Sequence, residues 1–425
     1  MNNIDWLTDP LTIVLAGTVL VSLFVYLTHR VATGTGVKQM EPNMGTRVFL
    51  VLLRLAIGWH LLVEGVDKIQ DPSWTSDSYL RAATGPLAPK FRELASNEAI
   101  EKMTLGENDT FPPALAKDWQ ATYDQFVTHY ELSDKQEEDA KKALENAKTT
   151  TLNWMKTSAN RPASVSTTVS GQAALNVPMR VAYYKQTLER IEKIEKEKLP
   201  RYSPMIEKDA QRELNRSIGE QRRNGYPPLT ENEKIEQLNK IKIKLRDKAH
   251  DELRTAQKEL IKTYNSLKSD MESKTLSMEK ALRDVLDEEQ LEKAPPTKSR
   301  LDNIRETPLP QWRDLIVSYG LTIAGGCLIL GLFTSLAAVF SALLLVMFYA
   351  AMPPLPDWPA NPKAEGTYLY INKNIIEMLA LFVLATVPSG RWVGLDGLVP
   401  FLAFWRGKKK DKDTQPGQQQ QQHSA

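Results

Sequence analysis

Cysteine is nearly absent from this sequence: Cys327 is the single one among 425 residues. One cysteine excludes an intramolecular disulfide, a Cys-x-x-Cys redox pair and a cysteine-ligated iron–sulfur cluster. Cys327 lies inside the apolar run LTIAGGCLILGLF, where we interpret it as a small packing residue. The five histidines are scattered along the chain, and no spacing between them resembles a zinc or haem site. We therefore expect no metal centre.

An excess of charge of one sign is also missing. Lys+Arg 54 nearly balance Asp+Glu 52, which leaves a net charge of +2. Such a balance gives no electrostatic reason to expect nucleic acid as a partner. No dinucleotide-binding or flavin-binding fingerprint is visible either. The negative mean hydropathy averages two very apolar ends and a very polar middle, so it does not indicate a soluble protein.

The first apolar run, residues 11–27, is uncharged and at the short end for a membrane span. A signal peptide is the alternative interpretation. However, the residues before the run include Asp5 and Asp9 and no lysine or arginine, and no small-x-small cleavage site follows. We therefore favour a retained transmembrane anchor.

The second apolar run, residues 47–69, is long enough to cross a bilayer yet contains Arg54, His60 and Glu64. Ionisable groups are costly within a span and usually face a bundle interior, so they are candidates for a functional site. Arg54 is the weaker candidate, because it lies about 10 Å from one end and could extend its side chain to the interface.

Residues 98–307 are rich in charged and amide side chains and contain no run that could span a membrane. The segment 230–293 has the longest helical pattern. Its apolar stripe from Leu238 to Leu267 has a period of about 3.6 residues, which fits a straight packed helix better than a left-handed coiled coil. The segments 114–157 and 178–222 are its expected neighbours. The charges favour a solvated surface, with partner binding as the functional alternative.

Two capping boxes predict helix starts in this region, at Ser133-x-x-Gln136 and Thr230-x-x-Glu233. Breaks are expected at four proline sites, Arg161–Pro162, Leu199–Pro200, Pro227–Pro228 and Pro295–Pro296. No catalytic constellation occurs between them.

The chain becomes apolar again near Trp312. Residues 315–333 and 336–352 predict two spans joined as an antiparallel hairpin, and 373–388 predicts another. The segment 390–405 is short and interrupted by glycine and proline, so we expect it to lie at the membrane interface.

Positive charge sets the expected orientation. The loop 28–46 carries Arg30 and Lys38, and the tail 406–425 carries five basic residues, so both should lie in the cytoplasm. The N-terminus and the 98–307 insert would then lie outside the inner membrane. Five spans satisfy this arrangement, and the glutamine-rich end of the tail is expected to be disordered.

This topology brings two polar clusters to the same depth at the outer side. One belongs to the first charged helix and the other to the last span, and their members are His60, Glu64, Asp67, Lys68, Asn372, Lys373, Asn374 and Glu377. The hypothesis is a polar pocket that holds a quinone headgroup or passes a proton. The structural alternative is that these groups reach the interface or pair to fix helix packing.

The residues around these clusters also carry a family resemblance. RLAIGWHLLVEGVDKI, with DPSWTSDSYLRAATGP after it, and EGTYLYINKNIIEMLALFVLATVPSGRWVGLDGLV resemble the DoxX/DoxD-like membrane family. DoxD is the membrane subunit of thiosulfate:quinone oxidoreductase. The resemblance covers about 47–90 and 315–400. It implies a four-helix membrane core, and it adds Trp59 to the hypothetical quinone-binding residues. The extra N-terminal helix and the long insert depart from the family pattern.

Together these observations predict an all-α, polytopic membrane bundle with a four-helix DoxX-like core, one N-terminal helix and an extramembrane α-helical insert. The expected parts are listed in chain order: 1–46, 47–97, 98–307, 308–405 and 406–425. The first functional hypothesis is a quinone-interacting subunit of a membrane oxidoreductase complex, with His60, Glu64 and Glu377 as proton or headgroup partners. The alternative is a membrane-anchored scaffold that binds a protein partner through the insert.

Overall fold

The structure is a computed structural model, and it describes residues 42–71, 74–157, 175–199, 203–293, 309–355, 358 and 370–398. The predicted anchor 11–27 and the basic tail lie outside these residues. The described part is all-α, with fourteen α-helices and no strand. It divides into a membrane unit, residues 1–75, 311–353 and 362–425, and a helical unit, residues 76–310 and 354–361.

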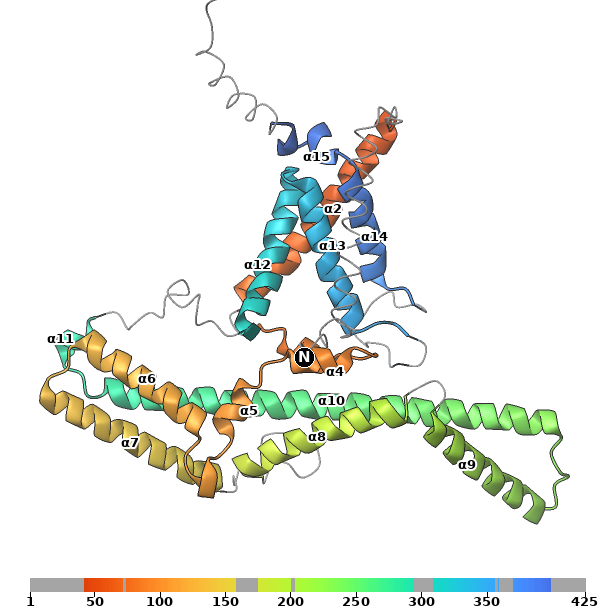
Figure 1. The fold of residues 1–425 in the computed structure, drawn as a ribbon, viewed down its shortest axis with the longest axis horizontal. Helices are drawn as coiled ribbons and strands as arrows, with labels where there is room; N and C mark the ends of the chain where they lie inside the picture. The colour runs from red at the N-terminus through yellow and green to blue at the C-terminus, as the bar shows by residue number, and fades with distance from the viewer. Residues whose placement is uncertain are drawn as a thin grey trace, which may run out of the picture. The chain divides into compact units, whose positions relative to one another are not determined.

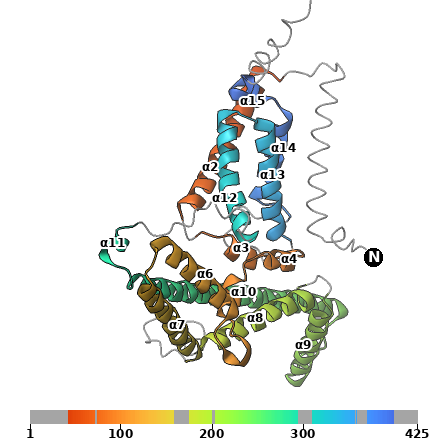
Figure 2. The same cartoon turned by 60° about the vertical axis from the view of Figure 1, so that its left-hand side comes forward.

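The membrane unit contains four main helices (Figures 1 and 2), α2 (Met44–Gln70), α12 (Leu309–Leu330), α13 (Thr334–Ala351) and α14 (Lys373–Thr386). Three of them are long and apolar enough to cross a membrane: α2, α12 from Trp312 onward, and α13. This is the pattern of a multi-pass membrane protein. With 14 residues, α14 is about 21 Å long, which is shorter than a typical hydrocarbon core of about 30 Å.

The predicted hairpin between the second and third of these helices is confirmed, with its turn two or three residues earlier in the chain than expected. α12 ends at Leu330 and α13 begins at Thr334. Gly331 and Phe333 occupy the left-handed region at φ 63° and 48°, which lets three residues reverse the chain. Glycine adopts this conformation at little cost, whereas Phe333 needs local support.

Glycines bring α2 and α12 into close contact. A Cβ atom on Gly65 would lie 2.3 Å from Thr322 Oγ1 and 2.5 Å from the Thr322 backbone nitrogen. A Cβ on Gly325 would lie 2.5 Å from the Leu62 nitrogen. These two glycines, together with Gly58, leave no room for a side chain, so the two backbones touch. Small residues of this kind allow close packing of apolar helices where the hydrophobic effect gives little help.

The helical unit is built along α10 (Glu231–Arg283), the long green helix of Figure 1. Its 53 residues make it about 80 Å long. Helices α5, α7, α8 and α9 pack along it. The other helices of the unit, in chain order, are α3 (Asp77–Arg81), α4 (Ala88–Glu93), α5 (Glu98–Met103), α6 (Pro113–Tyr130), α7 (Asp134–Lys156), α8 (Val177–Glu197), α9 (Pro204–Arg223) and α11 (Glu288–Leu291).

Several local predictions for this unit are confirmed. Both capping boxes are formed, at Ser133 and at Thr230. The apolar stripe of α10 is fully buried from Ala249 to Leu267, whereas its start, near Leu238, is only partly buried beside α9. Each expected neighbour of α10 consists of two helices, as the predicted helix start at Ser133 and the predicted break at Leu199–Pro200 imply. The helix itself stops at Arg283, and Asp287 caps a separate short helix.

Residues 76–97, which the sequence analysis placed before the insert, belong to the helical unit. Arg81 is fully buried there: its guanidinium lies 3.4 Å from the ring centroid of Tyr264 and donates to Tyr184 Oη at 3.2 Å. It also donates to the Ser96 carbonyl. Asp77 accepts from the Ser96 nitrogen at 2.8 Å. Burial raises the pKa of Tyr264, which keeps this phenol neutral beside the cation.

A buried ion pair makes a second connection to α8. Arg92 binds Glu195 through both guanidinium nitrogens, and Arg92 Nη1 lies 3.0 Å from Glu195 Oε1. Burial raises the pKa of Glu195, and Arg92 opposes that shift. A folded-state pKa above the unfolded one means that ionised Glu195 costs stability at neutral pH, and that this cost disappears as the pH falls. The cost comes from the burial of Glu195, and the two hydrogen bonds from Arg92 offset part of it.

The α2–α12 contact generates a test with a control on the facing helix, α12. Gly65→Ala should lower the melting temperature of the detergent-purified protein, because the new methyl group overlaps the Thr322 backbone; overpacking of this kind costs about 1–3 kcal/mol. Gly326→Ala, whose Cβ would meet no atom within 4 Å, should leave it unchanged or slightly raised. Equal melting temperatures for the two variants would contradict the contact.

Candidate functional site

The structure brings together two of the predicted site residues from opposite ends of the sequence. His60 on α2 and Glu377 on α14 form an ion pair, with Nδ1 2.9 Å from Oε1. The two helices run antiparallel: His60 meets Glu377, while Arg47, one end of α2, lies beside Trp392, beyond the other end of α14. The antiparallel arrangement therefore places both charged clusters at one level of the bundle.

Other charges extend this pair into the polar cluster, defined as His60, Glu64, Lys68, Lys373 and Glu377. One turn after His60, Glu64 accepts from Lys68 Nζ at 2.5 Å, and Lys68 also donates to the Glu64 carbonyl at 3.0 Å. Lys373 lies within electrostatic range of both His60 and Glu64. Acidic and basic groups thus alternate over two helices, which limits the net charge that the cluster places at the membrane.

The remaining predicted residues do not join this cluster in the same way. Trp59 is 64% exposed and lies on the outer surface of α2, and Asp67 is exposed too. Asn372 is buried and caps α14, where its side chain accepts from the Ile375 nitrogen at 3.3 Å. Asn374 is half-buried. Asn372 therefore has a structural role: it fixes the start of α14, the helix that carries Glu377.

The pair differs in access as well as in charge. The side chain of His60 is 43% exposed and that of Glu377 only 13%. The hydrogen bond to Glu377 Oε1 uses Nδ1 of the His60 ring. The other ring nitrogen, Nε2, remains as the second site that can carry a proton. A histidine held by a carboxylate is a standard arrangement for moving a proton or for hydrogen-bonding a polar headgroup. The cluster can therefore act as an acid or a base at the surface of the bundle.

A second polar assembly, at the other end of α2, was not anticipated. Arg54, which the sequence allowed to extend to the interface, is 1% exposed. Its Nη2 donates to the Val393 carbonyl at 2.6 Å, and the carboxylate of Asp396 balances its charge. Hydropathy and spacing carry no signal for this contact, because Val393 contributes only its backbone.

Asp396 is the centre of that assembly. Its two oxygens accept from the backbone nitrogens of Phe333, at 2.6 Å, and Thr334, at 3.0 Å. It therefore caps α13 from a distant part of the chain and supports the strained turn at Phe333. Its own nitrogen donates to the Gly331 carbonyl at 2.7 Å. Gly390 permits this approach, since a Cβ there would lie 2.3 Å from Asp396 Oδ2.

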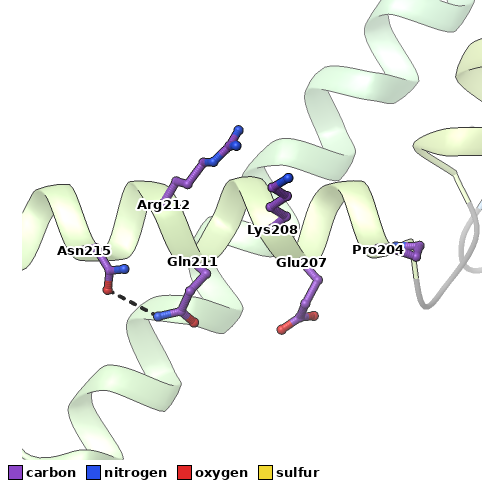
Figure 3. Close-up of a pocket in the computed structure, with 6 residues that line it drawn as sticks. All are labelled: Pro204, Glu207, Lys208, Gln211, Arg212 and Asn215. Carbon is purple, nitrogen blue, oxygen red and sulfur yellow. Dashed lines mark hydrogen bonds between the residues drawn. The ribbon is translucent and has the colours of Figure 1, made fainter.

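The helical unit has a shallow depression of about 450 Å³ along α9 (Figure 3). The side chains that line it are all from one helix, Pro204, Glu207, Lys208, Gln211, Arg212 and Asn215. In Figure 3 they spread along the helix instead of converging on one point, and Gln211 donates to Asn215 at 3.3 Å. We assign this depression no site. Across the described ranges, no group of three or more His, Cys, Asp or Glu residues could hold a metal ion.

Comparison with known proteins assigns no function to this chain, so any function is argued from the geometry described above. The chain matches no protein-family model, no curated protein and no solved structure.

Removing the Asp396 carboxylate should destabilise the membrane unit. Asp396→Ala leaves the two α13 nitrogens uncapped and Arg54 buried without a counter-charge, which together should cost about 3 kcal/mol. Asp396→Asn keeps one acceptor and should cost less. Thermal unfolding in detergent, followed by tryptophan fluorescence, measures both. Asp67→Ala, which removes an exposed carboxylate from the same unit, is the control; a melting temperature as low as that of Asp396→Ala would show that the cap has no special role.

Proposed function

We propose that this protein is a quinone-interacting subunit of a membrane oxidoreductase complex, and that the polar cluster is its headgroup site. The observation that carries the proposal is the ion pair between His60 and Glu377, because ionisable groups within membrane helices usually mark proton or ligand pathways. The resemblance to the DoxX/DoxD-like family supports the same function. Three spanning-length helices support a membrane location, and an inner-membrane orientation with the helical unit outside belongs to the proposal.

The residues of the cluster fit a quinone headgroup chemically. A quinone carries two carbonyl oxygens, which need hydrogen-bond donors, and the imidazole of His60 and the ammonium groups of Lys68 and Lys373 are donors. A bound quinone supplies two-electron, two-proton redox chemistry, with the electrons coming from a redox partner in the complex. His60 donates or accepts the proton, and Glu377 holds the imidazole in place and stabilises its charged form. The exposed side of His60 leaves the pair accessible from the bilayer.

Quinone retention tests this proposal. Glu377→Gln keeps the size of the side chain but removes the charge that holds His60, and one charge-assisted hydrogen bond is worth about 1.5–3 kcal/mol. The quinone extracted from the purified protein, quantified by mass spectrometry, should therefore fall at least about tenfold. Glu138→Gln, an exposed change on α7, is the matched control. Full quinone occupancy and full quinone-linked activity in Glu377→Gln would refute the role of the cluster.

A second function, partner binding by the helical unit, is favoured by a different observation. The hairpin of α9 and α10 exposes large apolar side chains outside the buried stripe, at Tyr226, Ile235 and Ile243. The buried charged side chains of this unit bind one another, as Arg92 and Glu195 do. What remains for recognition is the helical surface. We propose a protein partner that contacts the α9–α10 hairpin.

Charged substitutions on α10 distinguish this function from the first. Ile243→Lys should abolish stoichiometric co-purification of a partner with the full-length protein, because it buries an unpaired charge in an apolar contact. Leu276→Lys, an equally exposed site on the same helix, should have no effect. Quinone content should not change in either variant. A partner lost equally from both variants, or from neither, would argue against the hairpin as the docking surface.

A further inference from the structure

The end of the membrane unit opposite the polar cluster presents a surface made of two layers, one of exposed apolar side chains and one of basic and aromatic side chains. The segment 389–398 contains α15 (Ser389–Trp392) and the short 3-10 helix η4 (Leu395–Gly397). Its side chains Val393 and Leu398 are more than half exposed. On the neighbouring helix, Met44 and Phe49 at the start of α2 are about three-quarters exposed. The apolar layer therefore comes from two separate parts of the sequence.

Basic and aromatic side chains form the second layer. Arg391 is exposed and Trp392 half-exposed. The guanidinium of Arg47, from the first turn of α2, lies 5.5 Å from the centroid of the Trp392 ring. Tryptophan and arginine side by side, next to exposed aliphatic groups, are typical of the membrane–water boundary.

The one acidic residue described in 387–398 does not neutralise this layer. Both carboxylate oxygens of Asp396 accept hydrogen bonds from the start of α13, and the buried guanidinium of Arg54 balances its charge. The described surface of this segment is therefore positive. Farther along the sequence, five basic residues at 406–412 stand against Asp411 alone.

The segment is also fixed to the bundle and not merely adjacent to it. Arg54 holds the Val393 carbonyl at 2.6 Å, and the Asp396 nitrogen donates to the Gly331 carbonyl at 2.7 Å. Gly394 adopts φ 158° and lies against Gly331, where a Cβ would come within 2.7 Å of the Gly331 Cα. These three contacts, one from α2 and two from Gly331 in the turn between α12 and α13, hold Arg391 and Trp392 in place before any ligand arrives, which reduces the entropy lost on binding.

We propose that this surface, comprising Arg47, Arg391, Trp392, Val393 and Leu398, binds the headgroup of an anionic phospholipid. The phosphate and the extra negative charge of such a lipid face Arg391 and Arg47, and its acyl chains lie along Val393, Leu398 and Phe49. The apolar layer selects a lipid over a free anion, because a free phosphate gains nothing from it. This proposal is independent of the quinone site, which lies at the other end of α2.

Native mass spectrometry of the full-length protein in detergent tests the proposal. The probes are a phosphatidylglycerol and a phosphatidylcholine with the same acyl chains. The wild-type protein should retain phosphatidylglycerol in preference to phosphatidylcholine. Because each basic side chain near an anionic membrane surface contributes about a fivefold change in binding, Arg391→Gln should reduce that preference about fivefold.

The control is Arg212→Gln, which removes an exposed charge from α9 and should leave the preference unchanged. Arg391 is exposed, so its substitution should preserve the melting temperature, and this is measured on the same samples. Equal retention of the two lipids by the wild-type protein would overturn the proposal, as would a preference that Arg391→Gln does not alter. Loss of the phosphatidylglycerol signal in millimolar inorganic phosphate at constant ionic strength would also overturn it, in favour of a free-anion site.

Discussion

The backbone contact between α2 and α12 is the constraint on which the described membrane unit depends. Residues 71–308 separate these two helices, so the contact closes a very long loop, and the entropic cost of closure rises slowly with loop length. Gly58, Gly65 and Gly325 make closure favourable, because they let the backbones approach until dispersion contacts become dense. A helical unit with its own core can then be inserted between α2 and α12 without disrupting their packing.

Much of the architecture followed from local patterns. Apolar length predicted α2, α12 and α13, and the capping boxes at Ser133 and Thr230 fixed where α7 and α10 begin. The meeting of His60 and Glu377 followed from a simple argument: two antiparallel helices that carry charges at the same level must bring them together. Such predictions succeed because periodicity and topology act on whole helices, which tolerate small errors in their boundaries.

The contacts that escaped prediction are made by backbone atoms or by short irregular segments. The sequence allowed Arg54 to extend to the interface but could not identify its partner, the carbonyl of Val393 more than three hundred residues away, beside which Arg54 is buried. Asp396 caps a helix that begins 62 residues before it. The grouping of residues 76–97 with the helical unit rests on Arg81 and Arg92, whose partners lie on α8 and α10. A carbonyl acceptor has no residue type, so sequence patterns cannot identify it.

The separation of α2 from its partners has a consequence for biosynthesis. A ribosome adds about 5–20 residues each second, so roughly 12–50 s pass between the synthesis of α2 and that of α12. During this interval α2 holds Arg54, His60 and Glu64 with none of α12, α13 or α14 yet made. An unpaired arginine in a span costs up to about 2.5–3.5 kcal/mol on insertion scales, the upper figure applying at the helix centre. The nascent chain therefore benefits if α2 remains beside the translocon, or a chaperone, until the later helices arrive.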